Sequence, residues 1–152
     1  MGWTRRLLVC LASAWLAACG TGPLMTPGDD CLSCHRAGGS ARAFTIAGTA
    51  YSRGDAIATE GTPDLVVVIT DARDQRIELQ TNAAGNFYTD QAVAFPVAAE
   101  LHRGDSVRHM EPRVSTGACS SCHAEPPRGG AAGRVFIAPE SAAPPSPPPI
   151  AP

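Results

Sequence analysis

The chain contains no lysine and, after its N-terminus, no apolar run long enough to span a bilayer. Schiff-base catalysis is excluded, because it needs a lysine amine. All 12 basic residues are arginine, and 14 acidic residues bring the formal net charge to −2. Nucleic-acid binding would need a basic patch, which this balance does not favour. Paired carboxylates at motif spacing, a Ser/His/Asp signature and a phosphate loop are also missing, so an enzyme is the least expected class.

The chain does contain six cysteines, and four of them fall in two copies of one pattern. Residues 31–35 (CLSCH) and 119–123 (CSSCH) are both C-x-x-C-H, the attachment signature of a c-type haem. Two thiols on one short turn can each add to a vinyl group of a single porphyrin, and the next residue supplies an imidazole nitrogen to the iron. The sequence therefore predicts two covalently bound haem c groups, attached through Cys31, Cys34, Cys119 and Cys122, with His35 and His123 as the proximal iron ligands.

Two other chemistries use paired cysteines. Four thiolates could hold one zinc ion, but the pairs of a zinc ribbon are usually separated by about 15–20 residues, and the gap here is far longer. The pairs could also be two redox dithiols. Neither alternative explains why a histidine follows both pairs.

The motif does not specify the sixth ligand of either iron. A second histidine would give a low potential, and a methionine would raise it. Each candidate residue could instead have a purely structural role: His102 at a hairpin end, His109 in the core, Met110 at the surface or in packing, and Met25 in the tether. Met110 is the preferred candidate with His109 as its rival, and an open sixth position on one haem is the alternative. The remaining candidates are His102 and Met25.

Residues 1–18 have the pattern of a secretory signal, with a charged start and an apolar run that ends in small residues. Residues 16–20 (LAACG) resemble the lipobox of bacterial lipoproteins, in which cleavage leaves the cysteine, here Cys19, as the lipidated first residue. Gly20 at the next position implies sorting to the outer membrane, facing the periplasm or the cell surface. Cleavage without lipidation is the alternative. With Cys10 removed and Cys19 lipidated, no thiol is left over, as expected in an oxidising compartment.

Past a short tether (residues 19–30), the pattern is that of a β protein. Alternation with period two begins near residue 43, and residues 65–69 form a β-branched run typical of a strand buried on both faces. Turn signals recur at sandwich-like spacing, and about seven strands are expected. The dihaem β-sandwich domain is predicted to span residues 31–137. Residues 138–152 form a Pro-rich tail that cannot build a core and is predicted to be disordered.

Part of this region resembles the transthyretin-like or carboxypeptidase-regulatory-like β-sandwich family. The resemblance lies in residues 46–49 (IAGT), 66–71 (VVVITD) and 81–88 (TNAAGNFY). It implies an immunoglobulin-like sandwich used as a structural module, here with haem-binding loops at both ends of the domain. The family's pattern contains no C-x-x-C-H motif, so it implies nothing about the haems.

A hairpin is predicted between residues 93 and 114. A three-residue turn at residues 103–105 would pair Leu101 with Val107 and Glu100 with Arg108, and would place Val107 and His109 on the core face. His102 and Met110 would then point outward, where a haem could dock. A slip by one residue would put Leu101 opposite Arg108, which is the less favourable pairing.

These patterns together predict an exported, lipid-anchored dihaem c-type cytochrome that carries electrons to a redox partner protein at the cell envelope. A haem-based sensor that binds a small ligand at an open iron is the first alternative. A structural β-sandwich module with a metal or disulfides at the cysteine pairs is the second.

Overall fold

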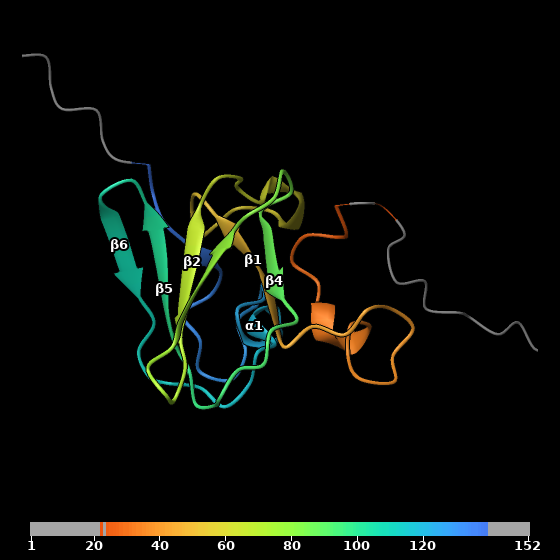
Figure 1. Cartoon of the computed structure of the whole chain (residues 1–152). Helices are drawn as coiled ribbons and strands as arrows, with labels where there is room; N and C mark the ends of the chain where they lie inside the picture. The colour runs from red at the N-terminus through yellow and green to blue at the C-terminus, as the bar shows by residue number, and fades with distance from the viewer. Residues whose placement is uncertain (1–21, 23, 140–152) are drawn as a thin grey trace, which may run out of the picture.

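The computed structural model describes residue 22 and residues 24–139 (Figure 1). These residues form a mainly β fold of seven strands in two sheets. The predicted signal segment 1–18, the lipidation site Cys19 and most of the Pro-rich tail lie outside the described residues.

The smaller sheet has three strands in the order β4-β1-β7 and the larger has four in the order β3-β2-β5-β6. In Figure 1 the larger sheet lies to the left of β1 and β4. The strands are β1 (Ile46–Tyr51), β2 (Val66–Thr70), β3 (Arg76–Gln80), β4 (Asn86–Thr89), β5 (Ala98–Arg103), β6 (Ser106–His109) and β7 (Val135–Phe136). Three helical turns complete the fold: η1 (Cys31–Ser33), η2 (Ala58–Glu60) and α1 (Cys119–Cys122).

The core lies between the two sheets, as burial of one apolar face from each sheet requires. The β-branched run of β2 is almost wholly buried, as predicted. The prediction of a β-sandwich of about seven strands is confirmed. The central cluster draws on both sheets and consists of Ile46, Ala50, Leu65, Val67, Ile69, Leu79, Phe87, Val97, Leu101 and Ile137.

Some predicted strands are shorter in the structure. β1 begins at Ile46 rather than near residue 43, and β5 begins at Ala98 rather than at Val93. β6 ends at His109, although an isolated bridge between Val97 and Val114 continues the pairing beyond it.

The turn between β2 and β3 is built on a buried carboxylate. Asp71 accepts hydrogen bonds from the backbone N–H groups of Arg73 (2.7 Å), Gln75 (3.0 Å) and Ala94 (3.1 Å). Burial alone would raise the pKa of Asp71. The three hydrogen bonds and the positive charge of the Arg73 side chain outweigh this effect and hold the pKa below its ordinary value. The charged form of Asp71 therefore stabilises both this turn and the segment that leads into β5.

Asp71→Asn is expected to lower the stability of the domain at neutral pH, because an amide offers one acceptor oxygen where the carboxylate offers two. In the wild type, the contribution of Asp71 is complete above the ordinary carboxyl pKa of 3.8 and is lost as the pH falls through the lower pKa of the folded chain. Urea unfolding across this pH range should show that loss in the wild type and much less of it in Asp71→Asn. Asp74→Asn, at an exposed carboxyl of the same turn, is the matched control.

The predicted register of the β5–β6 hairpin is wrong by one residue. The turn has two residues rather than three, and Arg103 pairs with Ser106, His102 with Val107 and Leu101 with Arg108. Gly104 has a φ of +53°, which suits the first position of a tight hairpin turn. Leu101 opposite Arg108 is tolerated because the Arg108 guanidinium lies 4.1 Å from the centre of the Phe136 ring.

The one-residue shift reverses the faces of the second hairpin strand. Val107 and His109, predicted in the core, lie on the exposed face. Met110 was predicted to point outward, but its side chain lies on the core-facing side and lines an apolar pocket. The N–H of Met110 donates to Ala99 O (2.9 Å), which continues the hairpin pairing by one residue. The predicted cross-strand pair of Glu100 with Arg108 is also wrong, because Glu100 stands opposite His109.

Candidate functional site

The first C-x-x-C-H motif forms one tight helical turn. Asp30 caps this turn by accepting a hydrogen bond from Leu32 N–H (3.2 Å) on its side-chain oxygen. The N–H of His35 donates to Cys31 O (2.9 Å), so the histidine lies one turn beyond the first cysteine. The local fold thus places both cysteines and the histidine on a single turn.

The second motif adopts the same geometry in a different part of the fold. α1 spans Cys119–Cys122, and the N–H of His123 donates to Cys119 O (3.0 Å). Apart from the cysteines, the histidine and one serine, the two motifs share no residue. The common turn is therefore a property of the spacing, as attachment of one porphyrin to both thiols would require.

Both motif histidines are oriented by the same kind of contact. His35 Nδ1 lies 2.7 Å from Arg42 O, and His123 Nδ1 lies 2.7 Å from Gly133 O. A carbonyl oxygen can only accept, so Nδ1 carries the hydrogen in each neutral ring and Nε2 keeps its lone pair. Ligating histidines in proteins are held in this way, with one ring N–H donated to a backbone carbonyl or carboxylate. In each ring the Nε2 lone pair is thus available to bind a metal ion.

The His35 ring is also fixed by aromatic stacking. Phe44 stacks on it with ring centres 4.3 Å apart, and Tyr88 stacks on Phe44 at 4.5 Å. The loop between the histidine and β1 is closed by the hydrogen bond from Phe44 N–H to His35 O (2.8 Å) and by an ion pair between Arg42 and Asp90. These contacts join the first motif to the end of β4.

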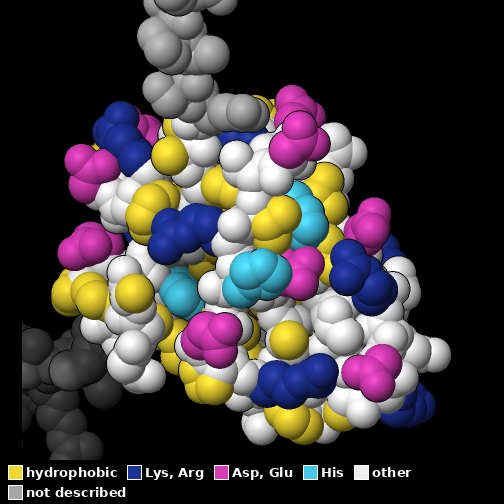
Figure 2. All heavy atoms as spheres, turned by 90° about the vertical axis from the view of Figure 1, so that its left-hand side faces the viewer, with side chains coloured by type: hydrophobic (Ala, Val, Ile, Leu, Met, Phe, Trp, Pro, Cys, Tyr) yellow, Lys and Arg dark blue, Asp and Glu magenta, His cyan; other side chains and the backbone are white. Residues whose placement is uncertain are grey.

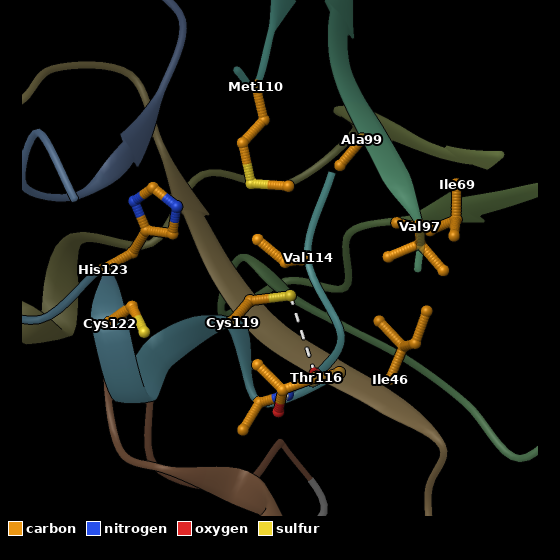
Figure 3. A pocket seen from close by; sticks show the side chains of 12 residues that line it. Ile46, Ile69, Val97, Ala99, Met110, Val114, Thr116, Cys119, Cys122 and His123 are labelled. Atoms are coloured by element: carbon orange, nitrogen blue, oxygen red, sulfur yellow. Dashed lines mark hydrogen bonds between the residues drawn. The ribbon is translucent and has the colours of Figure 1, made fainter. Parts of the chain in front are cut away.

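The second motif opens onto an apolar pocket (Figure 3). Cys119, Cys122 and His123 line one part of it, and Met110 points into it from the strand side. The pocket has a volume of about 50 Å³, well below the roughly 300–1,000 Å³ of sites that enclose a whole ligand. The other lining residues are Ile46, Ile69, Val97, Ala99, Val114, Thr116, Gly117 and Ala118.

Strand β1 brings the two motifs together, although they lie at the two ends of the domain's sequence. On the core side, a Cβ at Gly48 would lie 2.8 Å from Cys119 Cβ, so the absence of a side chain makes room for the second motif. On the other side, the N–H of Gly28, just before the first motif, donates to Thr49 Oγ1 (2.8 Å). Two successive β1 residues, Gly48 and Thr49, therefore contact the second motif and the segment that leads into the first.

The cysteines of the two motifs differ in thiol pKa and in bonding. Burial raises the pKa of Cys31, and desolvation together with the nearby Cys31 raises that of Cys119 to about 12. Cys34 is disulfide-bonded, and a thioether at this position would replace that bond. Among the described residues, no group of three or more His, Cys, Asp or Glu side chains is arranged to hold a metal ion.

Two of the candidate sixth ligands lie on the exposed face of the larger sheet, where histidines surround an acidic side chain (Figure 2). His102 Nε2 lies 2.8 Å from Glu100 Oε2, and His109 Nδ1 lies 3.4 Å from Glu100 Oε1. The hydrogen bond from His102 holds the pKa of Glu100 below its ordinary value. Neither histidine lines the pocket of the second motif.

Met25 lies in the segment before the first motif with a φ of +56°. This segment, predicted as a tether, is hydrogen-bonded to the domain, because Asn86 Nδ2 donates to Leu24 O (2.7 Å). Of the four candidate sixth ligands, the structure therefore brings Met110 alone into the pocket of the second motif.

Sequence reasoning missed the groups that orient the motif histidines. The acceptors are the backbone carbonyls of Arg42 and Gly133, which leave no side-chain signal in a sequence. The stacking of Phe44 on His35 and of Tyr88 on Phe44 depends on tertiary contacts, which no local pattern indicates.

Comparisons with family models, with curated proteins and with solved structures found no match to this chain. In the part of the chain that the structure describes, no helix combines the length and apolar character needed to cross a membrane.

Proposed function

We propose that this protein is an exported, lipid-anchored dihaem c-type cytochrome that carries electrons at the cell envelope. On this proposal the β-sandwich, a module of the transthyretin-like kind, is the scaffold for the two haem-attachment turns. The protein acts as an electron carrier rather than as a catalyst.

The observation that supports the proposal most strongly is the matched orientation of His35 and His123. Two segments with little else in common form the same turn, and in each the histidine Nδ1 lies 2.7 Å from a backbone carbonyl. A structural histidine needs no free Nε2, whereas a proximal iron ligand does. That this arrangement occurs twice, each time directly after a cysteine pair, favours haem ligation over an accidental contact.

The chain's own side chains would hold the two groups as follows. Cys31 and Cys34 would anchor the first, and Cys119 and Cys122 the second, while Met110 would serve as the sixth ligand beside His123. A haem bound at each site supplies an iron that alternates between the ferrous and ferric states, at a potential set by its ligands and its burial. The apolar lining of the Met110 pocket would keep water from that site and favour a higher potential.

Because β1 contacts both motifs, electrons would pass between the two sites across a single strand and on to a redox partner protein. Lipid attachment at Cys19 would keep the carrier at the membrane, with outer-membrane sorting as the expected destination. Two acyl chains anchor a protein stably where one does not.

A reductive titration of the matured protein tests this function. The expected result is uptake of two electrons per chain, with the spectral changes of a c-type haem in both steps. Uptake of no electrons by a colourless protein would contradict the proposal. Binding of carbon monoxide to one haem of the unmodified reduced protein would favour the sensor alternative instead.

A further inference from the structure

A buried arginine lies between the two motifs. Arg134, just before β7, is only 8% exposed, and its guanidinium donates from Nη1 to Tyr51 Oη (2.9 Å). The same guanidinium lies 4.6 Å from the centre of the Tyr51 ring. Tyr51 belongs to β1, the strand that both motifs contact.

The charge of Arg134 is not balanced within the described part of the chain. None of the ion pairs there includes Arg134, and among the buried side-chain nitrogens and oxygens there only Arg134 Nε is found without a hydrogen-bond partner. Burying a cation is costly unless it is paired with an anion, and an unmade hydrogen bond at a charged group adds to that cost. A guanidinium in this state is the expected partner of a carboxylate supplied from outside the polypeptide.

The position of Arg134 points to the first motif. A Cβ at Gly28 would lie 2.9 Å from Tyr51 Oη and 3.3 Å from Arg134 Nη1, and Gly28 has a φ of +82°. Gly28 stands three residues before Cys31, and the guanidinium therefore lies against the segment that leads into the first attachment turn. The neighbouring carboxylates of that segment, Asp29 and Asp30, are exposed, and neither forms an ion pair with Arg134, although the charge of Asp29 acts on Tyr51.

We propose that Arg134 binds a propionate carboxylate of the haem attached at Cys31 and Cys34. This inference rests on the proposed function, since it requires a haem at the first motif. Haem carries two propionates, so the cofactor itself would bring an anion to the buried cation. The adjacent residue, Gly133, supplies the carbonyl that holds His123. Two consecutive residues would thus contact both haem sites.

The experiment compares Arg134→Gln with the wild type in the fully matured protein. Loss of the cation leaves the propionate unbalanced, so the oxidised form of one haem is stabilised. We expect two haems to be retained and one midpoint potential to fall, with the oxidation equilibrium shifted about tenfold, or about 59 mV for a one-electron couple. That potential should also become dependent on pH, and the propionate bending bands in the resonance Raman spectrum should move. Arg128→Gln, at an exposed arginine of the same loop, should leave both potentials and bands unchanged.

A second pair of variants assigns the effect to one haem. In Cys119→Ala/Cys122→Ala, where only the first haem remains, Arg134→Gln should still lower the potential. In Cys31→Ala/Cys34→Ala it should have no effect. Arg134→Lys, which keeps the charge but loses the forked donors, should largely restore the potential and still alter the Raman bands. It is therefore the test to use if Arg134→Gln does not fold.

Unchanged potentials and unchanged Raman bands in a two-haem Arg134→Gln or Arg134→Lys protein would overturn the inference and leave a structural cation solvated by water. The proposed function would survive that result. A wild-type protein without haem would instead overturn the proposed function, and this inference with it.

Discussion

Replacing Cys119 and Cys122 with alanine is expected to halve the haem content, from two groups per chain to one. Both thioethers of the second site are lost, and His123 alone cannot retain a covalent haem. The pyridine haemochrome absorbance per chain should fall by half, and the intact mass should fall by one haem beyond the change in the cysteines. The reciprocal variant at Cys31 and Cys34 should give the same loss, and the combined variant should carry no haem.

Ser120→Ala/Ser121→Ala is the matched control, since it changes the same turn but leaves the C-x-x-C-H pattern intact. It should retain two haems. Retention of two haems by the cysteine variant would show that the second motif is not an attachment site.

Met110→His is expected to lower the midpoint potential of the second haem by well over the roughly 59 mV that marks a tenfold change in a one-electron equilibrium. A methionine ligand raises the potential relative to a histidine, and Met110 is the candidate that points into the pocket with His123. Spectroelectrochemistry should show one shifted couple and one unshifted couple. In Met110→Ala the sixth position should open, and carbon monoxide should then shift the Soret band of the reduced protein.

Two variants serve as controls for Met110. His109→Ala removes the rival candidate, which lies on the exposed face beside Glu100, and Met25→Ala removes the other methionine. Both should leave the second potential unchanged. A large shift in His109→Ala with none in Met110→His would contradict the assignment and require the hairpin to rearrange around the haem.

The two motifs and the strands could be predicted from the sequence because each depends on local pattern. The spacing of a cysteine pair followed by histidine favours one helical turn in both motifs, and the Val/Ile run of β2 favours burial on both faces. The turn that follows β2 depends in part on tertiary contact, because the third hydrogen bond to Asp71, from Ala94, comes from a distant segment.

The position of Met110 could not be predicted in the same way. The predicted register avoids placing Leu101 opposite Arg108. The structure has this pairing, and there the Arg108 guanidinium packs on the ring of Phe136, a residue distant in sequence. With the register shifted by one residue, Met110 moves from the outer face to the pocket. The prediction that Met110 points outward is therefore wrong, and its role as the sixth ligand stays a prediction.

The meeting of both motifs on β1 was equally beyond local pattern. It depends on the missing side chain at Gly48 and on the hydrogen bond from Gly28 to Thr49, which join segments distant in sequence. The unbalanced charge of Arg134 likewise emerges only when β7 is placed beside β1.

The most direct test of the central claim is a pyridine haemochrome spectrum, paired with intact mass, on the full chain expressed with a c-type maturation system. We predict a c-type spectrum and a mass that corresponds to two covalent haems per chain. A protein with the mass of the bare polypeptide and no haemochrome would contradict it, and would leave the cysteine pairs to metal or disulfide chemistry.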